Sequence, residues 1–103
     1  MSTSESTASQ TAPTSRAIVT IIGSDRVGII AGVTAVIAEA NVNILDISQS
    51  VIRDFFTMIM MVDLGQAFVT FHELSERLAD RGEQLGVRIE IQREDIFKAM
   101  HRI

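Results

Sequence analysis

The order of structural elements is decided by residues 17–51, which read AIVTIIGSDRVGIIAGVTAVIAEANVNILDISQSV. Residues 17–22 are β-branched and almost entirely apolar, which is typical of a buried strand. A short polar hinge, residues 24–28, leads into residues 29–40, where apolar side chains recur at helical spacing. A second strand is expected over residues 42–52. The stretch therefore predicts a strand, a hinge, a helix and a returning strand.

The hinge is a candidate ligand site, because the first N–H groups of a helix lack partners within the helix and carry partial positive charge. Such an end can receive a carboxylate or a phosphate. Ser24 or Asp25 is expected to cap the helix. Asp25 could instead hold a ligand ammonium group, and Arg26 could bind a carboxylate bidentately or be solvated. Gly28 would admit a ligand to the backbone or serve close packing of the helix on the sheet.

The remaining chain continues the alternation of strands and helices. Residues 55–64 predict a third strand, 68–85 a second helix, 87–92 a fourth strand, and 94–103 a short C-terminal helix. The order βαββαβ is that of the ferredoxin-like α+β fold, a two-layer sandwich in which two helices cover one face of a four-stranded antiparallel sheet. Both faces of the third strand are apolar, so its second face calls for a cover: a second copy, or the C-terminal helix.

Periodicity also predicts which side chains face the core. In the first helix these are Ile30, Val33, Ile37 and Ala40. In the second strand the inward set is Asn43, Leu45, Ile47, Gln49 and Val51, and the outward set is Ile44, Asp46, Ser48, Ser50 and Ile52. Arg53 and Asp54 form the following turn. Asn41 and Gly86 are expected to end the two helices, and Thr70 with Glu73 to form a capping box.

Composition excludes several functional classes. The 103 residues carry a net charge of −4 with acids and bases interspersed, which argues against nucleic-acid binding. No run approaches the roughly 20 apolar residues that span a bilayer, so a cytoplasmic protein without membrane contact is expected. Residues 1–16, with five Ser and four Thr, are expected to be a disordered tail. A hydrophobic fraction of 47% is high for so small a domain and suggests that another subunit covers part of it.

Catalytic and metal-binding constellations are missing from the sequence. There is no cysteine, and the two histidines, His72 and His101, share no ligand spacing with carboxylates. No nucleophile and base stand in a recognisable arrangement. We therefore expect no metal, no cofactor and no enzymatic activity.

Four motifs carry a family resemblance. They are the hinge Asp25-Arg26-Val27-Gly28-Ile29, the strand opening Asn43-Ile44-Leu45-Asp46-Ile47-Ser48-Gln49, the strand Phe56-Thr57-Met58, and the ending Asp95-Ile96-Phe97-Lys98-Ala99-Met100-His101-Arg102-Ile103. With these motifs the chain resembles an ACT domain over residues 17–103. It is most similar to the small stand-alone bacterial ACT proteins of the UPF0237 family.

The resemblance implies the βαββαβ fold and homodimers in which sheets or helices join side by side. It also implies a regulatory protein that binds a small metabolite, often an amino acid, at a subunit interface and modulates metabolism or a partner protein. Carried over by position, the ligand-binding residues would be Asp25, Arg26, Gly28, Ile29, Asn43 and Ile44.

Three alternatives stay open at this point. ACT domains also serve as ligand-free dimerisation or protein-interaction modules. Asn43 could be a turn residue that satisfies local backbone groups. Asp46, Ser48 and Gln49 could form a polar ligand rim or a solvated strand edge.

Overall fold

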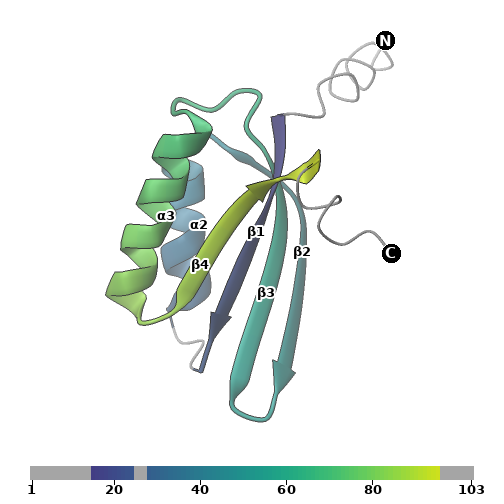
Figure 1. Cartoon of the computed structure of the whole chain (residues 1–103), viewed down its shortest axis with the longest axis vertical. Coiled ribbons are helices and arrows are strands. Elements are labelled where there is room, and N and C mark those ends of the chain that lie inside the picture. Colours follow the sequence, from purple (N-terminus) through teal and green to yellow (C-terminus); the bar gives the residue numbers. More distant parts are fainter. Residues whose placement is uncertain (1–14, 25–27, 96–103) are drawn as a thin grey trace.

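The computed structural model describes residues 15–24 and 28–95. Its elements are β1 (Arg16–Gly23), α2 (Ile29–Glu39), β2 (Asn43–Ile52), β3 (Phe55–Asp63), α3 (Phe71–Leu85) and β4 (Arg88–Arg93). The antiparallel sheet has the order β2-β3-β1-β4, and both helices cover one of its faces (Figure 1). The expected ferredoxin-like βαββαβ fold is confirmed. The expected disordered tail, residues 1–16, and the expected C-terminal helix, residues 94–103, lie mostly outside the described residues. The tail was predicted too long, because Arg16 begins β1 and pairs with Asp63.

The core lies between the helices and the sheet. On β3 every second side chain is fully buried under the helices: Phe56, Met58, Met60 and Val62. The buried face of α2 consists of Ile29, Val33, Val36 and Ile37. The prediction that Ile30 belongs to this face was wrong, because the helix begins at Ile29 and one residue turns the side chain by about 100°. Ile30 therefore emerges on the flank of α2 and is 37% exposed.

The two helices begin differently. The hydroxyl of Thr70 accepts a hydrogen bond from the Glu73 N–H (3.1 Å), and the Glu73 carboxylate accepts one from the Thr70 N–H (3.0 Å). This confirms the capping box and starts α3 at Phe71, later than the periodicity predicts, because the cap fixes the first turn. For α2 the expectation that Ser24 caps the helix was wrong. The N-cap is Gly28, whose φ of +79° is left-handed and has no side chain to offer.

Strand β2 contains a bulge at Leu45 that corrects the predicted faces. Asn43 pairs with Asp63 and Ile44 with Val62, but the next pair is Asp46 with Met61. The extra residue resets the alternation, so Ile44 and Ile47 both face the helices while Asn43 faces away from them. The predicted inward set thus loses Asn43 and gains Ile44. Most of β2 is also exposed, because it is an edge strand that the helices cover poorly.

The β2–β3 hairpin extends past the ends of both helices (Figure 1). Its turn is formed by Arg53 and Asp54, as predicted, with Arg53 at φ +56°. On the face of the sheet away from the helices, four exposed apolar side chains lie near this end of the hairpin. They form the distal patch: Ile22, Ile52, Phe55 and Ile59. The sequence predicts that a second copy or the C-terminal helix covers the second face of β3. The exposed large apolar side chains of β3 on that face, Phe55 and Ile59, both belong to this patch.

Candidate functional site

The hinge end of the molecule is organised by Gly28. Its position is exposed, and a Cβ built there would meet no atom within 4 Å. Close packing of helix on sheet is therefore not the reason for a glycine at this position. The reason is the left-handed backbone, which L side chains rarely adopt. Ile29, the next residue, is buried in the core and fixes the start of α2.

Within residues 15–24 and 28–95, no side chain accepts a hydrogen bond from the amides in the first turn of α2. Gly28, the N-cap residue, has no side chain that could accept a hydrogen bond from these amides, and the first turn contains no acidic residue. The first helical hydrogen bond runs from the Gly32 N–H to the Gly28 carbonyl (2.9 Å). The N–H groups that precede this bond in the chain can therefore donate hydrogen bonds to an anion from outside the helix. Asp25 and Arg26, the hinge residues expected to assist, lie outside the described residues.

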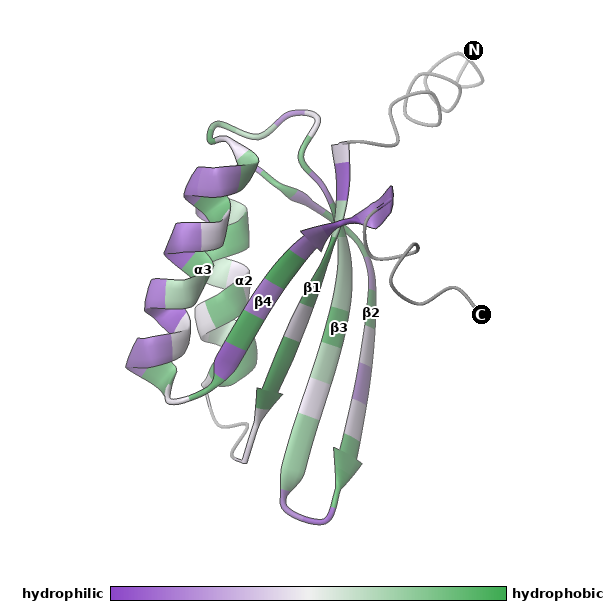
Figure 2. Cartoon of the chain, viewed as in Figure 1, coloured by the Kyte–Doolittle hydropathy of each residue, from purple (hydrophilic) through white to green (hydrophobic). Residues whose placement is uncertain are grey.

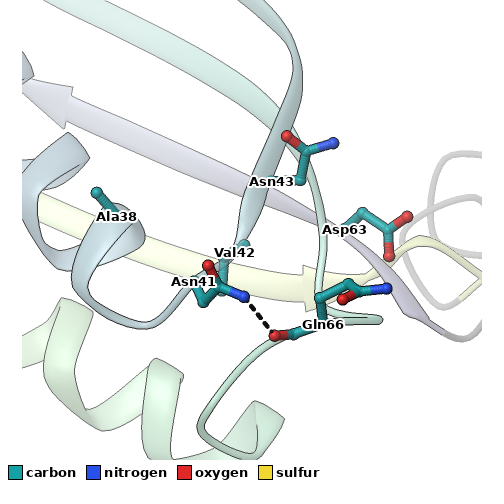
Figure 3. A pocket seen from close by; sticks show the side chains of 6 residues that line it. All are labelled: Ala38, Asn41, Val42, Asn43, Asp63 and Gln66. Carbon is teal, nitrogen blue, oxygen red and sulfur yellow. Dashed lines mark hydrogen bonds between the residues drawn. The ribbon is translucent and has the colours of Figure 1, made fainter.

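A cavity of about 480 Å³ lies at the other end of α2. Its lining comes from the C-terminal end of α2, the start of β2, the end of β3 and the following loop: Ala38, Asn41, Val42, Asn43, Asp63 and Gln66 (Figure 3). Its frame is held by two long-range hydrogen bonds. The Asn41 side-chain amide donates to the Gln66 carbonyl (2.8 Å), and the Phe68 N–H donates to the Ala40 carbonyl (2.8 Å).

The cavity offers polar groups of two kinds. Asn41, Asn43 and Gln66 bring side-chain amides, and Asp63 brings a carboxylate. The Asp63 carboxylate is oriented by the Gly65 N–H, which donates to its Oδ1 (2.8 Å). Amides both donate and accept, whereas an ionised carboxylate only accepts. This lining suits a small polar ligand that carries N–H donors.

Of the six site residues expected from the sequence, the four that the structure describes fall into two pairs at opposite ends of α2. Gly28 and Ile29 lie at the start of α2, whereas Asn43 and Ile44 follow its end. The 11 residues of α2 put about 16 Å between these positions along the helix axis. Asn43 lines the cavity, but Ile44 pairs with Val62 on the helix-covered face and does not. A small ligand therefore reaches only one half of the expected set in a single chain.

Five cavity residues were missed by the sequence reasoning: Ala38, Asn41, Val42, Asp63 and Gln66. Asn41 was assigned only to the helix end, where its φ of +60° confirms that role. The available signal was topological, since in this strand order the end of α2, the start of β2 and the end of β3 meet at one end of the sheet. Polar residues at all three places indicate a shared pocket.

Other chemistry finds no support in the described part of the chain. Within it, no three His, Cys, Asp or Glu side chains stand close enough to hold a metal ion. His72 is exposed and lies 3.1 Å from Glu76 on the outer side of α3. None of the helices described is long and apolar enough to cross a membrane.

Comparison with known proteins extends this description. The ACT domain family model matches residues 15–92. A UPF0237 protein of Methanopyrus kandleri is 54% identical over 88 residues, covering 85% of this chain and 98% of that protein. The solved ACT domain protein from Streptococcus pneumoniae is 42% identical, with a TM-score of 0.72 over 84% of this chain and 97% of that one. The regulatory subunit of aspartate kinase from Thermus thermophilus shares the fold, at 23% identity and a TM-score of 0.60 over 79% of this chain and 52% of that one.

Proposed function

Because the chain belongs to the UPF0237 family of ACT-domain proteins, we propose that it is a regulatory homodimer that binds an amino acid between its subunits. Binding would shift the population of states that engage a metabolic enzyme or another partner protein. The regulatory subunit of aspartate kinase, which has this fold, supports the regulatory role. In this proposal the protein is not itself an enzyme.

The observation that carries the proposal is the apolar edge between α2 and β2. The α2–β2 edge is formed by Ile30, Thr34, Ala38, Leu45 and Ile47, and none of these is charged. Gly32 faces α3, because a Cβ there would lie 2.8 Å from Leu85. Thr34 is two residues further on, about 200° around the axis, and so lies on the opposite flank. Helix α2 is hydrophobic around nearly all of its circumference (Figure 2). Its exposed flank is therefore suited to pack against a second copy of the chain.

Two-fold symmetry would complete the ligand site at this edge. An axis that passes near Thr34, the middle residue of α2, makes the two copies of the helix antiparallel. Gly28 of one protomer then lies beside the Asn43 cavity of its partner. Each dimer thus contains two equivalent sites, in which the uncapped N-terminus of one α2 faces the polar cavity of the other subunit. A ligand with a carboxylate at one end and polar groups at the other fits both halves.

A ligand screen tests the proposal. Each of the twenty amino acids and the common nucleotides is added at about 10 mM, and thermal unfolding is recorded. A ligand present at 100 times its dissociation constant adds about 2.7 kcal/mol to the free energy of unfolding. Asn43→Ala should abolish the shift, and Gln84→Ala, the loss of an exposed amide on α3, should preserve it. The absence of a shift with every compound would contradict the proposal.

Mixed dimers test whether the site is shared. Gly28→Asp places a negative charge at the hinge, and Asn43→Ala removes the cavity amide. In a dimer of one Gly28→Asp subunit and one Asn43→Ala subunit, a shared site predicts that one of the two sites is intact, so half of the wild-type binding stoichiometry returns. A site formed by the cavity of a single chain does not involve Gly28, so it predicts that the Gly28→Asp homodimer already binds at full stoichiometry, whereas a shared site predicts no binding by that homodimer. Titration calorimetry of the homodimer and the mixed dimer distinguishes the two results.

A second candidate function is a protein-interaction module that senses no ligand. The distal patch favours it, because Phe55 is 60% exposed and Ile59 is 40% exposed on the face of the sheet opposite α2 and α3. Under this alternative Ile59→Glu or Met61→Glu breaks the assembly, while Asn43→Ala leaves it intact. Pull-down with the wild-type and variant proteins separates this outcome from ligand sensing.

A further inference from the structure

We infer that Asp63 selects the ammonium group of the ligand, so that the cavity accepts α-amino acids and discriminates against the corresponding 2-hydroxy acids. The inference rests on the proposed function and concerns the same cavity. It assigns a role to a residue outside the hinge and strand-opening motifs. Among the described residues that line the cavity, Asp63 is the one charged side chain; the others are amides or apolar.

The charge of Asp63 is not neutralised by the nearest cation of the sheet. Arg16 is its cross-strand neighbour on β1. The Arg16 Nε instead donates to the Glu94 carboxylate at 3.0 Å, and Glu94 is 5% exposed. Within residues 15–24 and 28–95 no ion pair of Asp63 is found. A half-buried carboxylate therefore faces the cavity with its charge uncompensated, which favours a cationic group and repels an anionic one.

The orientation of the carboxylate is fixed by the loop that follows β3. One oxygen, Oδ1, accepts the hydrogen bond from the Gly65 N–H. A Cβ at Gly65 would lie 3.2 Å from this same oxygen, so glycine allows the close approach. The second oxygen, Oδ2, remains available as an acceptor. The Asp63 side chain is thus held in place by one oxygen and can bind ligand with the other.

The neighbouring amides add acceptors of the kind that an ammonium group needs. Asn43 lies opposite Asp63 in the strand register, and Gln66 follows in the loop. Figure 3 shows the Asp63 side chain between those of Asn43 and Gln66. Besides Asp63 Oδ2, the cavity thus offers the side-chain amide oxygens of Asn43 and Gln66 as acceptors, and that of Asn41 as a further one. An ammonium group has three N–H donors, whereas a hydroxyl has one.

Paired ligands and matched variants test the inference. The probes are each amino acid that stabilises the wild-type protein in the screen and its 2-hydroxy acid, which carries a hydroxyl in place of the ammonium group. Asp63→Asn removes the charge but keeps an oxygen that accepts from the Gly65 N–H, so the loop is preserved. Asp80→Asn makes the same change on the exposed side of α3, away from the cavity.

Titration calorimetry should show the amino acid binding at least about tenfold more tightly than its 2-hydroxy acid, as expected for a charge-assisted hydrogen bond. In Asp63→Asn the ratio should fall below about threefold, while Asp80→Asn should match the wild type. Equal binding of the two acids by the wild type, or an unchanged ratio in Asp63→Asn, would overturn the inference and leave the proposed function standing. If no amino acid binds the wild type, both are overturned.

Discussion

The two edges of the sheet differ in how they meet their surroundings. At one edge α3 and β4 are strongly charged on the outside, with Arg77, Asp80, Glu83, Arg88 and Glu90 exposed. At the other edge α2 has Glu39 as its single charged residue, and β2 exposes Leu45, Ile47 and Val51. Figure 2 shows the contrast as hydrophilic residues along α3 and a mostly hydrophobic α2.

The helix ends repeat this contrast. The N-terminus of α3 is closed by a capping box, whereas that of α2 has no side-chain cap. Charged residues at a sheet edge discourage pairing with other chains. The α3–β4 half therefore has a charged surface and a capped helix, while the α2–β2 half has exposed apolar side chains and a helix whose N-cap residue makes no side-chain hydrogen bond. The proposed dimer contact and the proposed ligand site both lie in the α2–β2 half of the molecule.

The largest effect is expected from a charge placed at the centre of the α2–β2 edge. Thr34→Arg puts two guanidinium groups beside each other at the two-fold axis, and like charges in an interface cost several kcal/mol. The dimer dissociation constant should rise at least about 100-fold, measured by analytical ultracentrifugation. Ala79→Arg, the matched change on α3, should leave the dimer intact. Mixing Thr34→Arg with Thr34→Glu should restore a heterodimer, and dimers of Thr34→Arg alone would contradict the interface.

The next effect compares a glycine in each helix. A Cβ at Gly82 in α3 would lie 2.9 Å from the Val87 carbonyl, which is backbone, whereas at Gly32 in α2 it would meet the flexible end of Leu85. Gly82→Ala should lower the free energy of unfolding by about 1–2 kcal/mol. The free energy of unfolding of Gly32→Ala should lie within about 0.5 kcal/mol of the wild-type value or above it, because alanine favours the helix. Urea denaturation measures both, and equal losses would contradict the distinction.

A third pair of glycine variants separates the cost of backbone strain from the effect on ligand binding. Gly28 and Gly86 have φ of +79° and +74°, and neither would crowd a Cβ. Gly28→Ala and Gly86→Ala should each cost about 1 kcal/mol, which lowers Tm by roughly 4–8 °C in a domain of this size. Calorimetry should show that only Gly28→Ala also weakens amino-acid binding. Equal binding by both variants would place the hinge outside the ligand site.

The smallest effect is expected at the charged edge. Arg88 Nη2 lies 2.7 Å from Glu90 Oε2, and both side chains are at least half exposed. Surface ion pairs of this kind contribute little, because water screens them. Glu90→Gln should change the free energy of unfolding by less than about 0.5 kcal/mol in urea titrations. A loss several times larger would show that the α3–β4 half depends on its charges for stability.

The sequence predicted the fold because its local signals agree with one another. Thr70 with Glu73, the turn at Arg53-Asp54 and the alternation of buried side chains on β3 each determine one element. It failed at Ile30 and at the faces of β2, where one residue at Gly28 or Leu45 resets the phase of the pattern. Periodicity does not detect the bulge, because Ile44 and Leu45 are both apolar and either could face the core.

The candidate site was predictable only in part. Gly28 and Asn43 were identified from motifs, but their placement at opposite ends of α2 follows from the path of the chain. Asp63 and Gln66 gave no local signal, because each is a single polar residue beside a strand end. Their proximity to Asn43 depends on strand register, which arises from tertiary packing.

The bulge at Leu45 has a consequence for solubility. An exposed edge strand rich in leucine, isoleucine and valine is the kind of template on which chains add without limit to form aggregates. The bulge interrupts the even spacing of backbone groups near the start of β2, so one continuous row of hydrogen bonds cannot extend along the whole edge. The same irregularity that turns Asn43 away from the helices thus favours closed pairs of molecules over fibrils.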